Sequence, residues 1–242
     1  MTTHRERKIH CAVCGTPQVV WEIMSYTSFG RSALDLSDQF MYPWAEIKYC
    51  TVCGYASPQL DKRPVHPEVI KSEEYRSILR HRWLHEYCKA NLCHSLFLVA
   101  EGEYAKAAWR TFRAATFCDN LFEHGARDYR LKAVELMGLA HQKSQCVTSN
   151  LEHDCLLKVD LLRQSGEFER AKSAIDEGLA CNPSELIRLL LEYEQRLIDA
   201  ADIGSHTIYE SGIDKHVLSK KSSGASETDE STDYDDDQSI YF

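Results

Sequence analysis

The sequence lacks the long apolar runs of membrane-spanning proteins. A helix needs roughly 20 mostly apolar residues to cross a bilayer, and the longest such run in the centre of the chain is Leu96–Ala100. The first ten residues carry charges with no apolar stretch behind them, so we expect no signal peptide. Together these absences predict a cytoplasmic protein.

Catalytic signatures are also missing. The sequence has no glycine-rich phosphate loop, no dinucleotide fingerprint and no nucleophile elbow. His85-Glu86 is not followed by a second histidine at the metalloprotease spacing. Asp35 and Asp38 are more typical of turns than of an acid–base pair. We therefore expect no catalysis by this chain.

Positive charge is scarce. The 242 residues include 28 Lys and Arg against 37 Asp and Glu, a net charge of −9, which argues against a general nucleic-acid binder. The exception is a small basic cluster of His4, Arg5, Arg7 and Lys8. A nucleic-acid-associated protein therefore remains an alternative, through phosphate contacts made by that cluster.

Acidic residues accumulate at the C-terminal end. Residues 203–242 hold three Lys or Arg and nine Asp or Glu, and almost nothing apolar from Ser219 until the last few positions. Such a segment buries too little apolar surface to offset the entropy lost on ordering. We predict that residues 204–242 form a disordered acidic tail.

Cysteine, in contrast, is abundant, with ten residues. Four of them form two Cys-x-x-Cys-Gly units, Cys11/Cys14 and Cys50/Cys53, separated by thirty-five residues. In a reducing compartment such pairs are more often metal ligands than disulfides. Four thiolates complete the tetrahedral shell of Zn²⁺ and leave no position for water or substrate. The motif therefore predicts one structural zinc ion.

The residues around these pairs predict a zinc ribbon over residues 9–57. Residues 18–29 are rich in β-branched and aromatic side chains and residues 44–50 alternate, which predicts two strands joined by a loop over residues 30–43. Two other interpretations of the cysteines stay open. The same shell accepts iron, and reactive dithiols would make the protein a thiol redox sensor.

The remainder of the ordered chain is predicted to be helical. Proline is absent between Pro67 and Pro183, and this interval has apolar residues at helical spacing. We interpret residues 58–71 as a linker and residues 72–203 as a helical domain of at least five helices. In such a two-part chain, loss of the metal is expected to unfold the ribbon and to leave the helix content unchanged.

Local signals place some helix ends. Ser72 precedes two acidic residues and is a good N-cap. One long helix is expected near residues 126–145. Asn182 and Glu185 have the spacing of a capping box for a last helix over residues 184–202.

Two segments of the helical domain match each other. Gly102-Glu-Tyr and Gly166-Glu-Phe are each expected to end one helix and begin the next. Small residues follow five and twelve positions later in both, as Ala107, Ala114, Ala171 and Gly178. This pattern resembles the tetratricopeptide repeat (TPR), a helix–turn–helix unit of about thirty-four residues. The resemblance implies an antiparallel TPR-like array.

The order of the parts resembles a group of uncharacterised bacterial proteins that join a zinc ribbon to TPR-like helices. The resemblance covers roughly residues 9–202. It depends on the four cysteines, the Gly54-Tyr55-Ala56 continuation and the Gly-Glu-aromatic turns. It implies an architecture but no activity, because a fold alone does not define a function.

Helical repeat arrays present concave surfaces to peptides or helices. We therefore predict an interaction adaptor or regulatory scaffold whose partner is another protein or peptide. Helix periodicity suggests that Asn91, His94, Lys158 and Arg163 line the groove.

A second metal site is a weaker possibility. His81, His85 and Cys88 have the i, i+4, i+7 spacing of one helix face, which suits metal ligation. The ordinary interpretation is two surface histidines and one packed cysteine.

Overall fold

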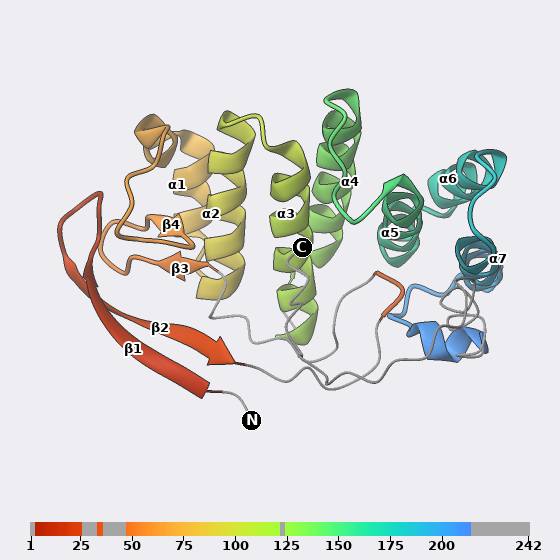
Figure 1. The fold of residues 1–242 in the computed structure, drawn as a ribbon, viewed down its shortest axis with the longest axis horizontal. Coiled ribbons are helices and arrows are strands. Elements are labelled where there is room, and N and C mark those ends of the chain that lie inside the picture. The colour runs from red at the N-terminus through yellow and green to blue at the C-terminus, as the bar shows by residue number, and fades with distance from the viewer. Residues whose placement is uncertain (1–2, 26–32, 36–46, 122–123, 214–242) are drawn as a thin grey trace, which may run out of the picture.

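The computed structural model describes residues 3–25, 33–35, 47–121 and 124–213. Within these ranges the chain is mainly helical, with a small β unit at its N-terminal end (Figure 1). The helices are α1 (Glu73–Arg80), α2 (Glu86–Ala100), α3 (Tyr104–Asn120), α4 (Ala126–Gln142), α5 (Leu151–Gln164), α6 (Phe168–Ala180) and α7 (Glu185–Asp199). The combination of a mainly helical chain with a small β unit was predicted from the sequence.

The β unit contains two antiparallel pairs of strands. β1 (Thr3–His10) pairs with β2 (Pro17–Ser25), and β3 (Lys48–Tyr49) pairs with β4 (Ala56–Ser57). One Cys-x-x-Cys-Gly unit lies in the turn of each pair.

The predicted strands are recovered in part. β2 covers the first part of the strand expected over residues 18–29, and β3 the end of the one expected over residues 44–50. Residues 44–46 and most of the expected loop over residues 30–43 lie outside the described residues. β1 was not predicted, because nearly all of its positions are polar or charged and only Ile9 is buried.

The two matched glycine turns have the same geometry. Gly102 has φ 76° and Gly166 has φ 73°, in the left-handed region that glycine adopts without steric cost. Glu103 N–H donates to Leu98 O at 2.8 Å, and Glu167 N–H donates to Leu162 O at 2.9 Å. These are the bonds of a Schellman motif, which ends one helix and directs the chain back along it.

Small residues let the antiparallel helices approach closely. Ala171 is fully buried in α6, and a Cβ atom on Gly178 would lie 2.4 Å from Cys155 Sγ of α5. In the first hairpin Ala107 and Ala114 of α3 are fully buried as well. α3 packs between α2 and α4, whereas α5 contacts both α6 and α7.

Most of the expected helix ends are observed. The Ser72 side chain accepts from Tyr75 N–H and begins α1, and α4 lies within the predicted span of residues 126–145. The capping box at Asn182 and Glu185 was wrong. Asn182 has φ 51°, and the N–H of Ser184, the N-cap of α7, donates instead to the Glu152 carboxylate of α5 at 3.0 Å.

The β unit shares a hydrophobic core with α1 and α2. Tyr75 of α1 donates its hydroxyl hydrogen to Gly54 O at 2.8 Å and accepts from Ala56 N–H at 3.2 Å. Phe97 of α2 packs edge-on against both Tyr55 and Tyr75, with ring centroids 5.6 Å apart in each pair. The two cysteine turns are therefore continuous with the helical region.

The expected linker, residues 58–71, contributes to this shared core. Leu60 and Ile70 are buried in it. Residues Pro67–Lys71 form a short 3-10 helix, η2, directly before α1.

Regular structure continues beyond residue 204, the predicted start of the tail. Ile208–Ser211 form a second 3-10 helix, η3, with a capping box between Thr207 and Glu210. Ile208 and Ile213 pack against the helical core. The sequence interpretation missed this because polar residues surround these two apolar ones. Residues 214–242, including the acidic stretch, lie outside the described residues.

A short part of the insert between the cysteine pairs reaches the far end of the helices. Leu34 is fully buried among core residues of the helical region. Its N–H donates to His206 O at 2.9 Å, and Ala33 forms an antiparallel bridge with Thr207. This part of the predicted ribbon thus packs outside the β unit, against the C-terminal end of the described chain.

Candidate metal centre

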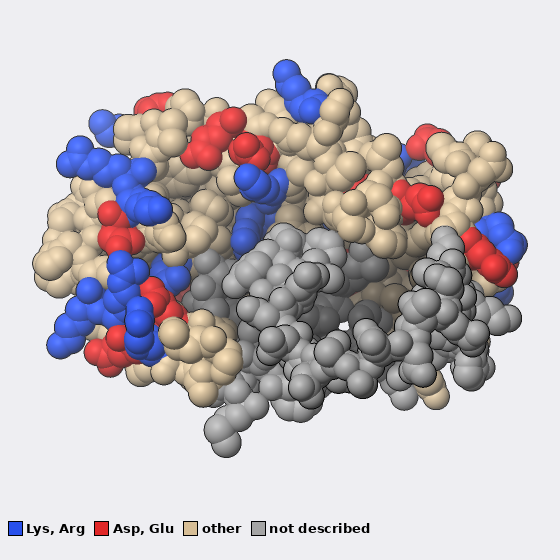
Figure 2. Space-filling view, viewed as in Figure 1, with Lys and Arg blue, Asp and Glu red and all other residues tan. Residues whose placement is uncertain are grey.

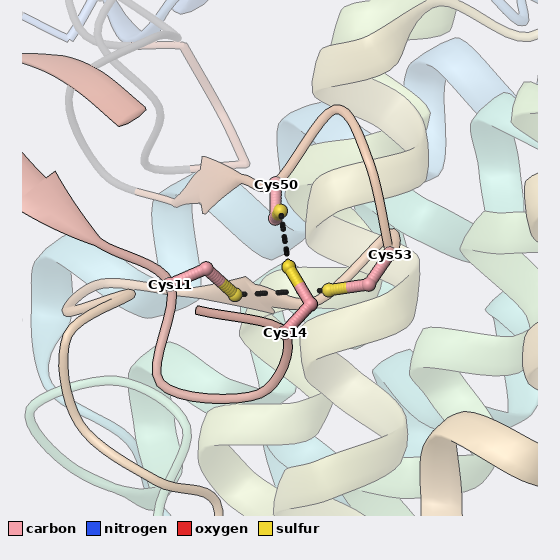
Figure 3. Close-up of side chains that lie close together, drawn as sticks. All are labelled: Cys11, Cys14, Cys50 and Cys53. Atoms are coloured by element: carbon pink, nitrogen blue, oxygen red, sulfur yellow. Dashed lines mark hydrogen bonds between the residues drawn. The ribbon is translucent and has the colours of Figure 1, made fainter. Parts of the chain in front are cut away.

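The four cysteines of the two Cys-x-x-Cys-Gly units form one cluster (Figure 3). Their Sγ atoms all lie within 4.8 Å of one another. Cys11 Sγ is 3.7 Å from Cys53 Sγ, and Cys14 Sγ is 3.7 Å from Cys50 Sγ. Sulfurs from both turns point to a common centre, and the group is able to hold a metal ion.

Both turns have the same backbone geometry. Gly15 N–H donates to Cys11 O at 2.8 Å and Gly54 N–H to Cys50 O at 2.9 Å. The N–H of the first cysteine in each turn also donates across the turn, from Cys11 to Thr16 O and from Cys50 to Tyr55 O. Gly15 and Gly54 have φ values of 73° and 78°. The glycine after each second cysteine is therefore required by the turn itself.

The four thiols have different environments. Cys11 and Cys50 are buried, Cys53 is half-buried and Cys14 is exposed. Burial raises the pKa of Cys11 and of Cys53. The Thr16 hydroxyl, followed by the Thr16 backbone, lowers the pKa of Cys14 to about 6. Before a metal binds, Cys14 therefore has more thiolate character than Cys11 or Cys53.

The glycine turns supply a test of how closely the centre is packed against α1. We expect Gly15→Ala to cost about 1–2 kcal/mol in the free energy of unfolding, because alanine is strained at positive φ. Gly54→Ala should cost a further ~1–3 kcal/mol, since its Cβ would lie 2.5 Å from Leu79 Cδ1. Nothing lies within 4 Å of the corresponding position at Gly15. Denaturant unfolding of the metal-loaded variants measures both, and equal losses would mean that Leu79 moves aside without cost.

The second metal site is not assembled. His81 ends α1 and His85 begins α2, so the three residues do not share a helix face. The His85 ring accepts from Tyr87 N–H at 3.3 Å, and Cys88 is fully buried with its Sγ 3.5 Å from Cys118 Sγ. Within the described part of the chain, the four-cysteine group is the only cluster of three or more potential metal ligands.

Two of the four predicted groove residues are inside the protein. Asn91 is 1% exposed, and its Nδ2 donates to Tyr87 O at 2.9 Å. Arg163 is fully buried between two carboxylates. Helix periodicity did not identify them as buried, because it takes polar side chains as solvent-facing. Neither is available to a partner.

The other two remain near the surface. His94 is half-buried, and burial, followed by the charge of Arg110, lowers its pKa to about 4, so the ring is neutral at pH 7. Lys158 is one-third exposed and pairs with Glu177 at 3.0 Å. The structure does not bring these two residues into one site with the cysteines.

The basic cluster at the N-terminal end is largely neutralised. Arg5 and Arg7 both pair with Glu22 at 3.0 Å, and Arg7 also pairs with Asp61 at 2.5 Å. Figure 2 accordingly shows Lys and Arg side by side with Asp and Glu over the β1–β2 end of the molecule. Paired cations attract phosphate less than free ones, which weakens the nucleic-acid alternative.

Among the helices within the described residues, none combines the length and apolarity needed to cross a bilayer. Comparisons of the chain with protein-family models, with curated proteins and with solved structures gave no match.

Proposed function

We propose that this chain is a zinc-stabilised protein-interaction module with no catalysis of its own. The observation that carries the proposal is the arrangement of the four sulfurs. For Zn–S bonds of about 2.3 Å, the edge of a regular tetrahedron is about 3.8 Å long. The two Sγ–Sγ distances between the turns, both 3.7 Å, agree with that edge length.

The ligand set supports a structural role for the zinc. All four positions would be filled by protein sulfur, from Cys11, Cys14, Cys50 and Cys53, with none left for water or substrate. Iron in the same shell is the main alternative. A reducing compartment such as the cytoplasm suits four cysteines that are not joined by disulfides.

The helical region supports the interaction role. The Schellman turn between α5 and α6 and the contact of α5 with both α6 and α7 suit a TPR-like unit followed by a capping helix. The α2–α3–α4 region departs from a regular array, since α2 does not pack on α4 in the way that α5 packs on α7. We propose that the resemblance to TPR proteins applies best to residues 151–199.

Elemental analysis of the purified chain tests the metal. We expect about one zinc per chain, lost in a Cys11→Ser/Cys50→Ser double variant. Iron with visible absorbance, or no metal, would contradict the structural zinc and favour a thiol redox sensor. In that case mild peroxide should oxidise the four thiols of the cluster first.

A further inference from the structure

A cleft with a volume of about 570 Å³ lies between the two strand pairs and the start of α2. Its floor is formed by the buried residues Val20, Ile47 and Ala90. Its walls are the aromatic side chains of Trp21, Tyr49 and Tyr87. Binding sites commonly combine such an apolar interior with a polar rim.

Strand edges line this cleft. Four consecutive residues of β2, 18–21, and the consecutive residues 47–49 at β3 border it. Successive side chains of a strand point to opposite faces, so an unbroken run along a cleft means that the strand lies edge-on to it. β1 pairs with the other edge of β2, and β4 with the other edge of β3. In the described part of the chain, neither cleft-facing edge is paired with a further strand.

Among the described residues, no further strand bonds to the cleft-facing edges of β2 and β3. In an antiparallel pair, every second residue turns both its N–H and its C=O away from the partner strand. β2 and β3 therefore present backbone donors and acceptors to the cleft from two sides. An extended peptide is the ligand chemistry that matches such groups along both edges at once.

The two outer edges of the β1–β2 pair differ in charge. β1 carries four consecutive charged residues, Arg5 to Lys8, the kind of sequence that discourages the addition of another strand. The cleft-facing residues of β2 are Gln18, Val19, Val20 and Trp21, with no charge among them. Val19 is 55% exposed and Trp21 51% exposed, unusual for large apolar side chains.

We propose that this cleft binds an extended segment of a partner protein, which adds as a strand between β2 and β3 and places alternate apolar side chains against Trp21, Tyr49 and Tyr87. This inference rests on the proposed interaction function and locates the partner on the metal-stabilised β unit. The bound segment is predicted to be uncharged where it contacts β2.

The test is selection of random peptides of about seven residues, the length of an ordinary strand, against the full zinc-loaded chain. We expect enriched peptides with alternating apolar residues. Trp21→Ala should weaken their binding about tenfold or more. Met24→Ala is the matched control, since Met24 is 59% exposed on the same strand but does not line the cleft. Its binding should be unchanged.

A second measurement needs no protein variant. N-methylation of alternate peptide amides removes the donors that face one neighbouring strand but keeps the side chains. Because the bound strand would pair with β2 on one side and β3 on the other, methylation of either alternate set should weaken binding. Enriched peptides that tolerate both N-methylation and Trp21→Ala would overturn the strand-addition site while supporting an interaction function elsewhere. If no peptide were enriched, the cleft proposal would fail, and the interaction function would rest on the helical region alone.

Discussion

Loss of the metal is expected to unfold α1 and α2 together with the β unit. The structural reason is the shared core, in which Phe97 of α2 packs on Tyr55, beside a cysteine turn, and on Tyr75 of α1. Zinc binding in small zinc-finger peptides contributes on the order of 10–16 kcal/mol, as much as the whole stability of an ordinary domain, about 5–15 kcal/mol. The helices that depend on this core should therefore be lost with the metal.

Circular dichroism and segment-resolved hydrogen exchange measure this in the Cys11→Ser/Cys50→Ser variant. Protection should fall over the 8 residues of α1 and the 15 of α2, while α5 to α7 keep theirs because they pack in a second core, shared mainly with α3 and α4 rather than with the β unit. Cys146→Ser/Cys181→Ser is the matched control, since both of these cysteines are exposed and outside the cluster. An unchanged helix signal would contradict this prediction and would mean that the β unit unfolds alone, as expected from the sequence.

Arg163→Met is expected to cost about 3–5 kcal/mol, the usual penalty for leaving buried charges without their partner. Arg163 donates to Glu194 at 2.6 Å and to Asp160 at 2.5 Å, and all three side chains are fully buried. It also donates to the carbonyls of Asp202 and Gly204, both at 2.8 Å. The variant should therefore also release the segment that leads to η3. Thermal unfolding measures the first effect, and hydrogen exchange of residues 202–213 the second.

A second substitution separates charge from packing at this site. Burial, followed by the charge of Asp160, raises the pKa of Glu194. The folded chain therefore keeps a proton at pH values where an unfolded glutamate, with a pKa near 4.5, has lost it. The contribution of Glu194 to the free energy of unfolding is fully present below that pH. It is lost as the pH rises through the higher pKa that Glu194 has in the folded chain. Glu194→Gln should remove this decline and recover part of the loss in Arg163→Met. No recovery in the double variant would mean that packing causes the loss.

Features encoded by a few neighbouring residues were predicted well. The Cys-x-x-Cys-Gly spacing requires only a tight turn, so it identified all four members of the cluster. Gly102 and Gly166 marked their turns for the same reason, because a positive φ is a property of one residue. The start of α1 at Ser72 belongs to this group as well.

Features that depend on distant residues were not predicted. Periodicity placed Arg163 on the surface, but α5 contacts α7, and the arginine lies between Asp160 of its own helix, Glu194 of α7 and the segment after α7. Leu34 has no strand or helix pattern around it, and its burial depends on His206 and Thr207. A single sequence contains no local signal for such pairings.

The bridge between Ala33 and Thr207 also sets an order of events during synthesis. The insert that carries Leu34 is translated long before its backbone partners at His206 and Thr207. Contacts with so large a sequence separation form late and slow folding. On the ribosome, the cysteine turns and α1 to α4 can be complete while the Leu34 site is still unmade. The nascent chain therefore depends on the half that carries the cysteine turns until η3 has been released.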